Sequence, residues 1–197
     1  MFGGAFDPPH DAHVALAQAA QAQLQLDVLH VLPTGEAWHK TRTLSPAADR
    51  LAMTRLAFAH CPGVIVDERE LRRSGPTYTV DTLTQLQADY PHSQLYLIVG
   101  ADQARALPGW HRWGDIPQLA IISVAFRGDG TAEHADFDPG HPVPGVVPDR
   151  FAPLRLPAMP HSATDIRSRV AAGLGIDHLV APAVARYIEQ HHLYLAA

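Results

Sequence analysis

Short apolar runs alternate with longer helical segments along this chain, and this alternation limits the folds open to it. The runs at residues 95–99 and 119–126 are apolar at nearly every position, which is typical of strands covered on both faces of a parallel sheet. Residues 28–32 and 64–67 predict two more strands. Parallel strands are joined by right-handed crossovers, usually through helices. We therefore expect an α/β fold, a doubly wound Rossmann-like parallel sheet flanked by helices.

The segments between these runs have the periodicity and the boundary residues of helices. Helices are predicted at residues 14–26, 50–59, 79–90 and 182–192. Residues 128–149 are rich in Pro, Gly and Asp and lack periodicity, which predicts a flexible loop. No repeat and no long linker divides the chain. We expect residues 1–197 to form a single domain, with a helical part at 157–197.

Composition excludes several classes of protein. The formal net charge of −5 and the absence of a basic run argue against a nucleic-acid binder. No apolar run is long enough to span a membrane, and nothing is similar to a signal peptide. The single cysteine, Cys61, cannot form an internal disulfide, which fits a cytoplasmic protein. Composition leaves a homo-oligomer open.

The first residues of the chain carry the densest group of chemical side chains, in the stretch GGAFDPPHDAH from Gly3 to His13. Two glycines allow a tight turn and the close approach of a bulky anion. His10 and His13 share a face if both lie in the first turn of the following helix, where the helix dipole favours phosphate. We therefore expect chemistry on a nucleotide phosphate. Two surface histidines at a loop-to-helix junction are the alternative.

Two further features add to this expectation. Lys40 is the only lysine among 15 basic residues, and an ammonium suits a moving phosphate charge. Ser162 and Asp165 fit a capping box, and the amides, hydroxyls and Arg167 of that helix start can hold phosphate oxygens. The first strand is expected to be very short, because only Met1 and Phe2 precede the glycines; either it is truncated or the start lies upstream.

Six segments resemble a known family. The first stretch resembles the GGxFDPxHxGH form of the (H/T)xGH signature of the nucleotidyltransferases, with Ala12 in place of glycine, and residues 162–167 resemble its SSTxIR motif, with Ala163 in place of serine. Residues 33–40, 75–82, 100–113 and 184–194 resemble PxxxPPHK, GPSYTxDT, the GAD and LPxW pair, and VxxYIxxxxLY. Ala37 and Trp38 replace the usual Pro-Pro. The ordered set resembles the bacterial nicotinate-nucleotide adenylyltransferases, nearly end to end.

This resemblance implies a nucleotidyltransferase that moves the adenylyl group of ATP onto nicotinate mononucleotide, giving deamido-NAD and pyrophosphate in NAD biosynthesis. It implies Mg²⁺ carried with ATP and no dedicated metal ligands. The implied catalytic residues are His10, His13, Lys40 and Arg167. The implied ATP-binding residues are Gly3, Gly4, Ala5, Phe6, His10, His13, Arg127, Ser162, Thr164, Ile166 and Arg167. The implied nicotinate-nucleotide-binding residues are Asp7, Lys40, Thr79, Gly100, Asp102 and Trp110.

Several alternatives stay open at this point. A phosphopantetheine adenylyltransferase-like enzyme, an enzyme for nicotinamide mononucleotide, a metallohydrolase using His10 and His13, and a non-catalytic nucleotide-binding relative each fit part of the pattern. Single residues also have ordinary structural interpretations. Asp102 fits a cap at a strand end, Thr79 fits a helix N-cap, and Trp110 fits core packing; Arg127 fits an exposed surface.

Overall fold

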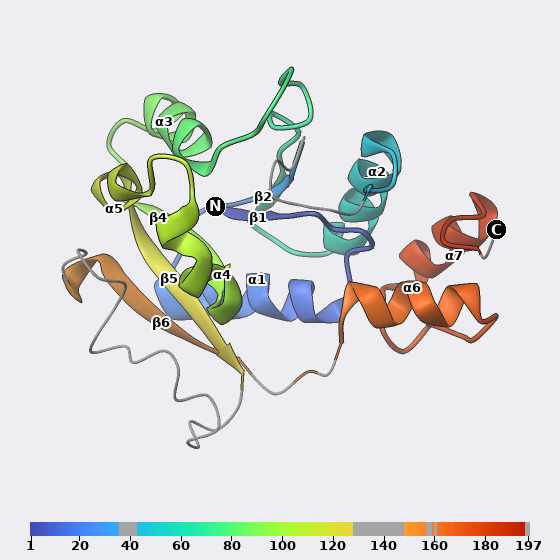
Figure 1. Ribbon diagram of the computed structural model, residues 1–197. Coiled ribbons are helices and arrows are strands. Elements are labelled where there is room, and N and C mark those ends of the chain that lie inside the picture. Colours follow the sequence, from blue (N-terminus) through green and yellow to red (C-terminus); the bar gives the residue numbers. More distant parts are fainter. Residues whose placement is uncertain (36–42, 128–147, 157–158, 160, 196–197) are drawn as a thin grey trace.

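The computed structural model describes residues 1–35, 43–127, 148–156, 159 and 161–195. Within them, six strands form one sheet in the order β3-β2-β1-β4-β5-β6, and all neighbouring strands are parallel (Figure 1). The order reverses between β1 and β4, so the doubly wound α/β sheet is confirmed. The strands are β1 Phe2–Gly4, β2 Leu29–Pro33, β3 Val64–Val66, β4 Leu95–Gly100, β5 Ala120–Arg127 and β6 Phe151–Leu156.

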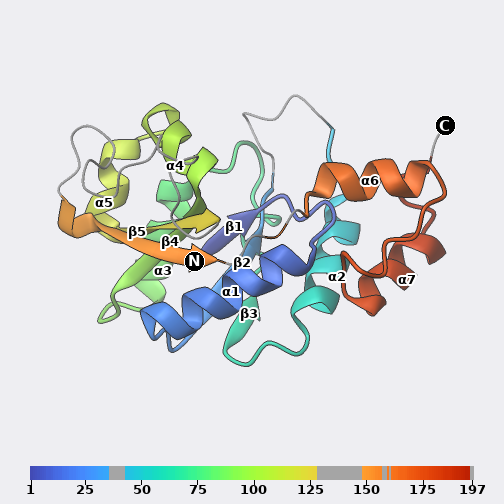
Figure 2. The same ribbon diagram turned by 90° about the horizontal axis from the view of Figure 1, so that it is seen from below.

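Helices cover both faces of the sheet (Figures 1 and 2). They are α1 Asp11–Leu24, α2 Ala47–Phe58, α3 Thr79–Asp89, α4 Ala101–Ala106, α5 Ile116–Leu119, α6 Ala163–Ala171 and α7 Pro182–Gln190. Short 3₁₀ turns lie at Leu107–Gly109, Trp113–Asp115 and Pro148–Arg150. None of the helices in the described ranges is long and apolar enough to cross a membrane.

The two faces of the sheet bury separate apolar clusters. Ile98 of β4 packs with α1 and α2, through residues such as Leu16 and Phe58. Its neighbours Leu97 and Val99 pack on the opposite face with α3, α4 and α5. This alternation is the period of two that a strand imposes. It explains why the run at residues 95–99 is continuously apolar.

A third cluster holds the C-terminal helices against α2. Met53 of α2, Ile166 of α6 and Val184 of α7 are fully buried in it. Figure 2 shows α6 and α7 beside α2, beyond the end of the sheet. Because α6 is fixed there, its N-terminus lies at the same edge of the sheet as the N-terminus of α1.

The strands predicted at residues 28–32, 64–67, 95–99 and 119–126 are confirmed with small shifts of their ends. The first helix was expected at 14–26, but it begins at Asp11 and ends at Leu24, where Gln25 adopts a left-handed conformation with φ of 50°. The sequence interpretation missed α4, α5 and β6. β6 is the last strand of the sheet and contains Pro153, which an edge strand tolerates but which weakens the strand signal. Of the predicted loop, 128–147 lie outside the described residues.

The first strand is short, as expected, and yet it lies in the middle of the sheet. Its three residues pair with β2, and Phe2 pairs with Ile98 of β4. The amide of Ile98 also donates to the carbonyl of Met1 at 2.9 Å. A few parallel bonds on each side therefore hold β1 at the point where the strand order reverses.

Candidate active site

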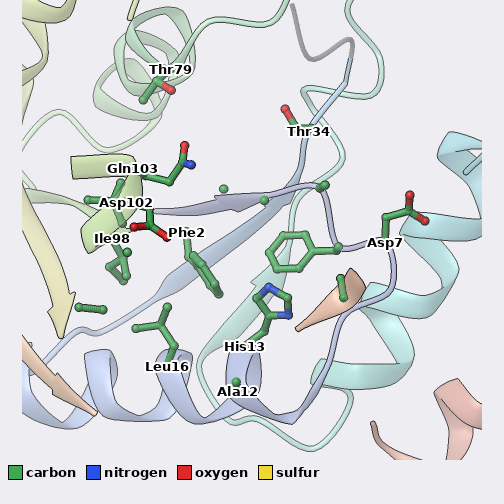
Figure 3. Close-up of a pocket in the computed structure, with 18 of the residues that line it drawn as sticks. Phe2, Asp7, Ala12, His13, Leu16, Thr34, Thr79, Ile98, Asp102 and Gln103 are labelled. Atoms are coloured by element: carbon green, nitrogen blue, oxygen red, sulfur yellow. The ribbon is translucent and has the colours of Figure 1, made fainter. Parts of the chain in front are cut away.

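A cavity of about 930 Å³ opens at the carboxyl ends of β1 and β4, where the sheet reverses its order. This is the position at which doubly wound sheets bind ligands. Figure 3 shows His13 and Ala12 of α1 on one side of this cavity and Thr79 and Asp102 on the other. Fourteen of the sequence-predicted site residues line it: Gly3, Gly4, Ala5, Phe6, Asp7, His10, His13, Thr79, Gly100, Asp102, Trp110, Ser162, Thr164 and Arg167.

The turn between β1 and α1 is shaped by an aromatic ring. A Cβ atom on Gly4 would lie 3.0 Å from the Phe6 ring, so the ring occupies the space that a side chain at position 4 would need. Phe6 has φ of 48° and is 2% exposed. Its ring meets the His13 ring edge-on, at a centroid distance of 5.0 Å. The glycine is therefore needed for packing, and that packing helps to orient His13.

His10 and His13 lie together at the start of α1, as the sequence predicted. His10 is the N-cap residue, and the two ring centroids are 3.8 Å apart. The backbone N–H of His10 donates to Nδ1 of His13 at 3.1 Å. Because Nδ1 accepts this bond, the neutral His13 ring carries its proton on Nε2 and is a donor there. The positive end of the helix dipole lies at the same point and favours phosphate.

Asp7 is a buried junction between distant parts of the chain. It is 2% exposed, and its carboxylate accepts from the Ser45 N–H at 3.2 Å and from the Tyr194 hydroxyl at 2.7 Å. Its backbone carbonyl accepts from Nη1 of Arg167 at 2.8 Å. Figure 3 shows the carboxylate turned toward the side of α2, away from the His13 ring. Asp7 lines the cavity, but these carboxylate contacts are structural.

The start of α6 brings a second helix N-terminus to the cavity. Ser162 is its N-cap, and the Ser162 hydroxyl accepts from the Asp165 N–H at 3.1 Å, which is one half of the predicted capping box. Arg167 also donates to the Thr164 hydroxyl at 3.0 Å. Ile166 is fully buried in the cluster with α2 and α7 and is not among the residues that line the cavity.

The other end of the cavity is aromatic and more exposed. Trp110 is half-buried, packs against the core cluster of α3 to α5, and also lines the cavity. Beside it, His111 stacks on Tyr78 with ring centroids 4.1 Å apart and an interplanar angle of 28°. Trp113 packs on the same cluster and is not among the cavity-lining residues, which agrees with a core role for it. A planar ligand group fits such an aromatic surface.

Two of the ordinary structural interpretations are wrong. The N-cap of α3 is Tyr78, and Thr79 is the first helical residue, so Thr79 is not the N-cap. Its backbone N–H belongs to the first turn, where such groups have no partner within the helix. Asp102 does not cap a strand end or a helix: its side chain is 86% exposed and pairs with Arg105 across one turn of α4. Both residues line the cavity.

Arg50 is a site-supporting residue that sequence reasoning missed. It is 3% exposed, and its guanidinium donates to the carbonyls of Ala5 at 3.0 Å, Thr34 at 2.8 Å and Ser45 at 3.0 Å. These bonds connect the β1–α1 turn, the end of β2 and the segment before α2. A guanidinium has five N–H donors in a fixed planar arrangement, so one arginine can bind several carbonyl oxygens at once. The only signal in the sequence was a charged residue at the start of an amphipathic helix.

Glu70 is a second missed residue, and it lines the cavity. It is 4% exposed, and burial raises the pKa of its carboxyl, which accepts from the Thr82 hydroxyl at 2.8 Å. A Cβ on Gly35 would lie 2.3 Å from the Glu70 carbonyl oxygen, so the loops after β2 and β3 touch here. Close contact between these loops requires glycine at position 35.

Two predicted residues are not placed. Lys40, with Ala37 and Trp38, lies outside the described residues. Arg127 is the last residue of β5, at the carboxyl edge of the sheet, but its side chain is outside the described part. The roles assigned to both stay predictions.

The residues present suit a magnesium ion that is held mainly by its ligand. In the described ranges, no three His, Cys, Asp or Glu side chains converge on one point. Mg²⁺ commonly keeps several waters and binds through substrate phosphates with one or two carboxylates. Asp102 is an exposed carboxylate in the cavity and is the side chain best placed to meet such a hydrated ion.

The model of the cytidylyltransferase-like family matches residues 1–169. The chain therefore belongs to this class of nucleotidyltransferases. A protein of Albidiferax ferrireducens named probable nicotinate-nucleotide adenylyltransferase is 58% identical over 197 residues, covering 100% of this chain and 98% of the relative. One of the same name from Methylibium petroleiphilum is 39% identical, covering 98% of this chain and 91% of the relative. The chain belongs to the nicotinate-nucleotide adenylyltransferase family.

Solved structures agree on the fold. Plasmodium falciparum nicotinic acid mononucleotide adenylyltransferase, complexed with APC, superposes with a TM-score of 0.77 at 17% identity and covers 98% of this chain and 94% of its own. The same protein complexed with NaAD gives 0.77 at 16% identity, covering 98% and 95%. At 16–17% identity, these structures support the fold alone and do not support the role of any single residue.

Proposed function

We propose that this protein transfers the adenylyl group of ATP to nicotinate mononucleotide, forming deamido-NAD and releasing pyrophosphate in NAD biosynthesis. A phosphate oxygen of the mononucleotide attacks the α-phosphorus of ATP, and the bond from that phosphorus to the bridging oxygen breaks. The electron pair leaves with pyrophosphate. No enzyme nucleophile is needed, so the protein must align two anions and offset their repulsion.

The observation that carries this proposal is the meeting of two helix N-termini at one cavity, with an aromatic surface at its other end. The starts of α1 and α6 bring His13 and Arg167 to the first end, and Trp110 lines the second. Donors at helix N-termini suit a polyphosphate, and a tryptophan face suits a pyridine ring. Family membership at 58% identity over the full chain supports the same reaction.

The residues then divide the work. His13 donates from Nε2 to a phosphate oxygen of ATP, with His10 supporting its orientation through the backbone bond to Nδ1. Arg167 and the Ser162–Thr164 amides hold the departing pyrophosphate. Trp110 stacks on the pyridine, and the first-turn amide of Thr79 faces its carboxylate. Lys40 neutralises the approaching phosphates. These roles are our assignments for this chain.

Magnesium would enter with ATP and would reduce the negative charge of the phosphates. Asp102 is the proposed contact for its water shell. We also expect no nucleic-acid or membrane partner and a cytoplasmic location; each stays a prediction, as does the oligomeric state.

The direct test measures pyrophosphate release from Mg-ATP with nicotinate mononucleotide, and in parallel with nicotinamide mononucleotide and phosphopantetheine. We expect rapid release with the acid, a deamido-NAD product, and slower turnover with the amide. Preference for phosphopantetheine would assign the chain to the other adenylyltransferase class. Folded protein that binds ATP and turns over none of the three would contradict an enzyme and favour a nucleotide sensor.

A further inference from the structure

Tyr194 follows α7 and is separated from the first motif by nearly the whole chain, yet it hydrogen-bonds to that motif. We propose that Tyr194 is a positioning residue for adenylyl transfer: through Asp7 it holds the backbone that carries His10, His13 and the Arg167 contact. This inference rests on the proposed function for its kinetic test, and on geometry alone for its spectroscopic test.

The bond between these residues has the usual length of an O–H···O bond and is partly buried. The Tyr194 hydroxyl donates to Oδ1 of Asp7 at 2.7 Å, and it also lies 3.9 Å from the sulfur of Met53 in α2. Burial, together with the bond to Asp7, raises the pKa of the Tyr194 phenol, so the hydroxyl keeps its proton and stays a donor. A hydrogen bond from a phenol to a carboxylate is charge-assisted and is stronger than a neutral one.

Asp7 transmits this contact to the cavity through its own backbone. Its carbonyl accepts from Arg167, which lines the cavity, so a rotation of the Asp7 peptide moves the partner of this guanidinium. The next two residues are Pro8 and Pro9, both buried, whose rings restrict φ. They lead directly to His10, whose N–H orients His13. The path from Tyr194 to His13 thus has few free torsions.

The second oxygen of Asp7 extends the network toward α2. Oδ2 accepts from the Ser45 N–H at 3.2 Å, and the Ser45 carbonyl accepts from Arg50. Arg50 in turn donates to Ala5, inside the first motif. Loss of the Tyr194 bond leaves a buried carboxylate with one fewer donor, and such a group will turn toward the remaining donors. A turn of this carboxylate changes the motif and the Arg167 contact together.

The chain supplies a matched control for a purely structural role. Tyr187, in α7, donates to Oδ1 of Asp49 in α2 at 2.9 Å. This is the same pair of chemical groups, and it also joins the C-terminal segment to α2. Neither Tyr187 nor Asp49 is among the residues lining the cavity. Removing either hydroxyl therefore removes one hydrogen bond to a carboxylate of α2 or of the first motif, but only the bond of Tyr194 reaches the site.

The experiment compares Tyr194→Phe with Tyr187→Phe in the full-length protein. We expect a decrease in Tm for both, larger for Tyr194→Phe because Asp7 is buried whereas Asp49 is only partly buried. Tyr194→Phe should lower kcat about 10- to 100-fold, the range of a small misplacement of catalytic groups, with KM for both substrates changed about threefold or less. Tyr187→Phe should keep kcat within about twofold of wild type. A lower Tm with unchanged kcat in both variants would overturn the proposal.

A double-mutant cycle identifies the route. In an Asp7→Ala background, adding Tyr194→Phe should change the single-turnover rate by about twofold or less, because the shared bond is already absent. Independent, multiplying effects would contradict action through Asp7. The ¹⁵N shift of Nδ1 of His13 gives a readout without substrate: it should move in Tyr194→Phe and not in Tyr187→Phe. If wild type is inactive, this shift still decides the positioning role, while the proposed function alone fails.

Discussion

The two ends of the cavity are built in different ways. At the end with His13 and Arg167, the side chains are held by contacts between residues far apart in sequence, such as Arg167 with the Asp7 carbonyl and Tyr194 with the Asp7 carboxylate. At the end with Trp110, two ion pairs join residues that are close in sequence. Asp102 pairs with Arg105 three residues on, and Arg112 pairs with Asp115 in the same way.

This difference indicates what each end does. Long-range bonds to buried groups such as Asp7 keep donors in one geometry, which a transition state with moving charge requires. Exposed local pairs contribute little to stability and let side chains adjust to a bound ring. We therefore expect the first end to control kcat and the second end to control KM. The following predictions test this division, in order of decreasing effect.

His13→Ala should lower kcat about 100-fold or more, since removal of one preorganised donor to developing charge has effects of this size. His13 is half-buried at the helix start, so folding should be retained, as circular dichroism would check. His92→Ala is the control, because His92 is exposed and precedes β4 at the opposite edge of the sheet. A kcat near wild type for His13→Ala would remove this ring from the mechanism.

Trp110→Ala should raise KM for nicotinate mononucleotide about 10-fold, which corresponds to the binding free energy of one aromatic stacking contact. KM for ATP should change little. Trp113→Ala is the matched control, because Trp113 packs on the same cluster without being a cavity-lining residue. It should lower Tm while leaving both KM values near wild type. Steady-state kinetics with each substrate varied separately would give the KM values of both variants. Equal increases in both KM values for Trp110→Ala would contradict stacking on the pyridine.

Asp102→Asn should change Tm very little, because an exposed pair such as Asp102 with Arg105 contributes about 0–1 kcal/mol. Its kinetic effect should be about two- to threefold and should appear as a higher requirement for Mg²⁺, since one carboxylate near a hydrated ion is replaced. Titration of the rate with Mg²⁺ at fixed ATP would measure this. A Mg²⁺ dependence identical to that of wild type would contradict the proposed contact.

Glu70→Gln should affect stability and its pH dependence more than turnover. Burial raises the pKa of the Glu70 carboxyl from 4.5, so the folded protein binds this proton more tightly than the unfolded chain does. The favourable contribution is complete below pH 4.5 and is lost as the pH rises through the folded pKa. Glu70→Gln should therefore have a smaller decline in unfolding free energy with rising pH. Urea unfolding across this pH range would reveal it; parallel curves for the two proteins would contradict a raised pKa.

Several features of the site could be predicted because they depend on neighbours in sequence. The 3-residue spacing predicted that the rings of His10 and His13 lie together, and the structure confirms this, with His10 as the N-cap and not in the first turn. The run at 95–99 predicted β4 and hence Gly100 at the edge of the cavity. In contrast, β6 was missed because Pro153 breaks its pattern, and only pairing with β5 makes it a strand.

The sequence by itself determined the α/β alternation and the family, because periodicity and local motifs depend on residues that are close together in the sequence. Only the tertiary structure showed that the Asp7 carboxylate accepts hydrogen bonds from Tyr194 and Ser45. It also showed that Arg50 donates to three backbone carbonyls and that Glu70 is buried. Burial and long-range hydrogen bonds depend on which distant segments pack together, and no local pattern encodes that packing.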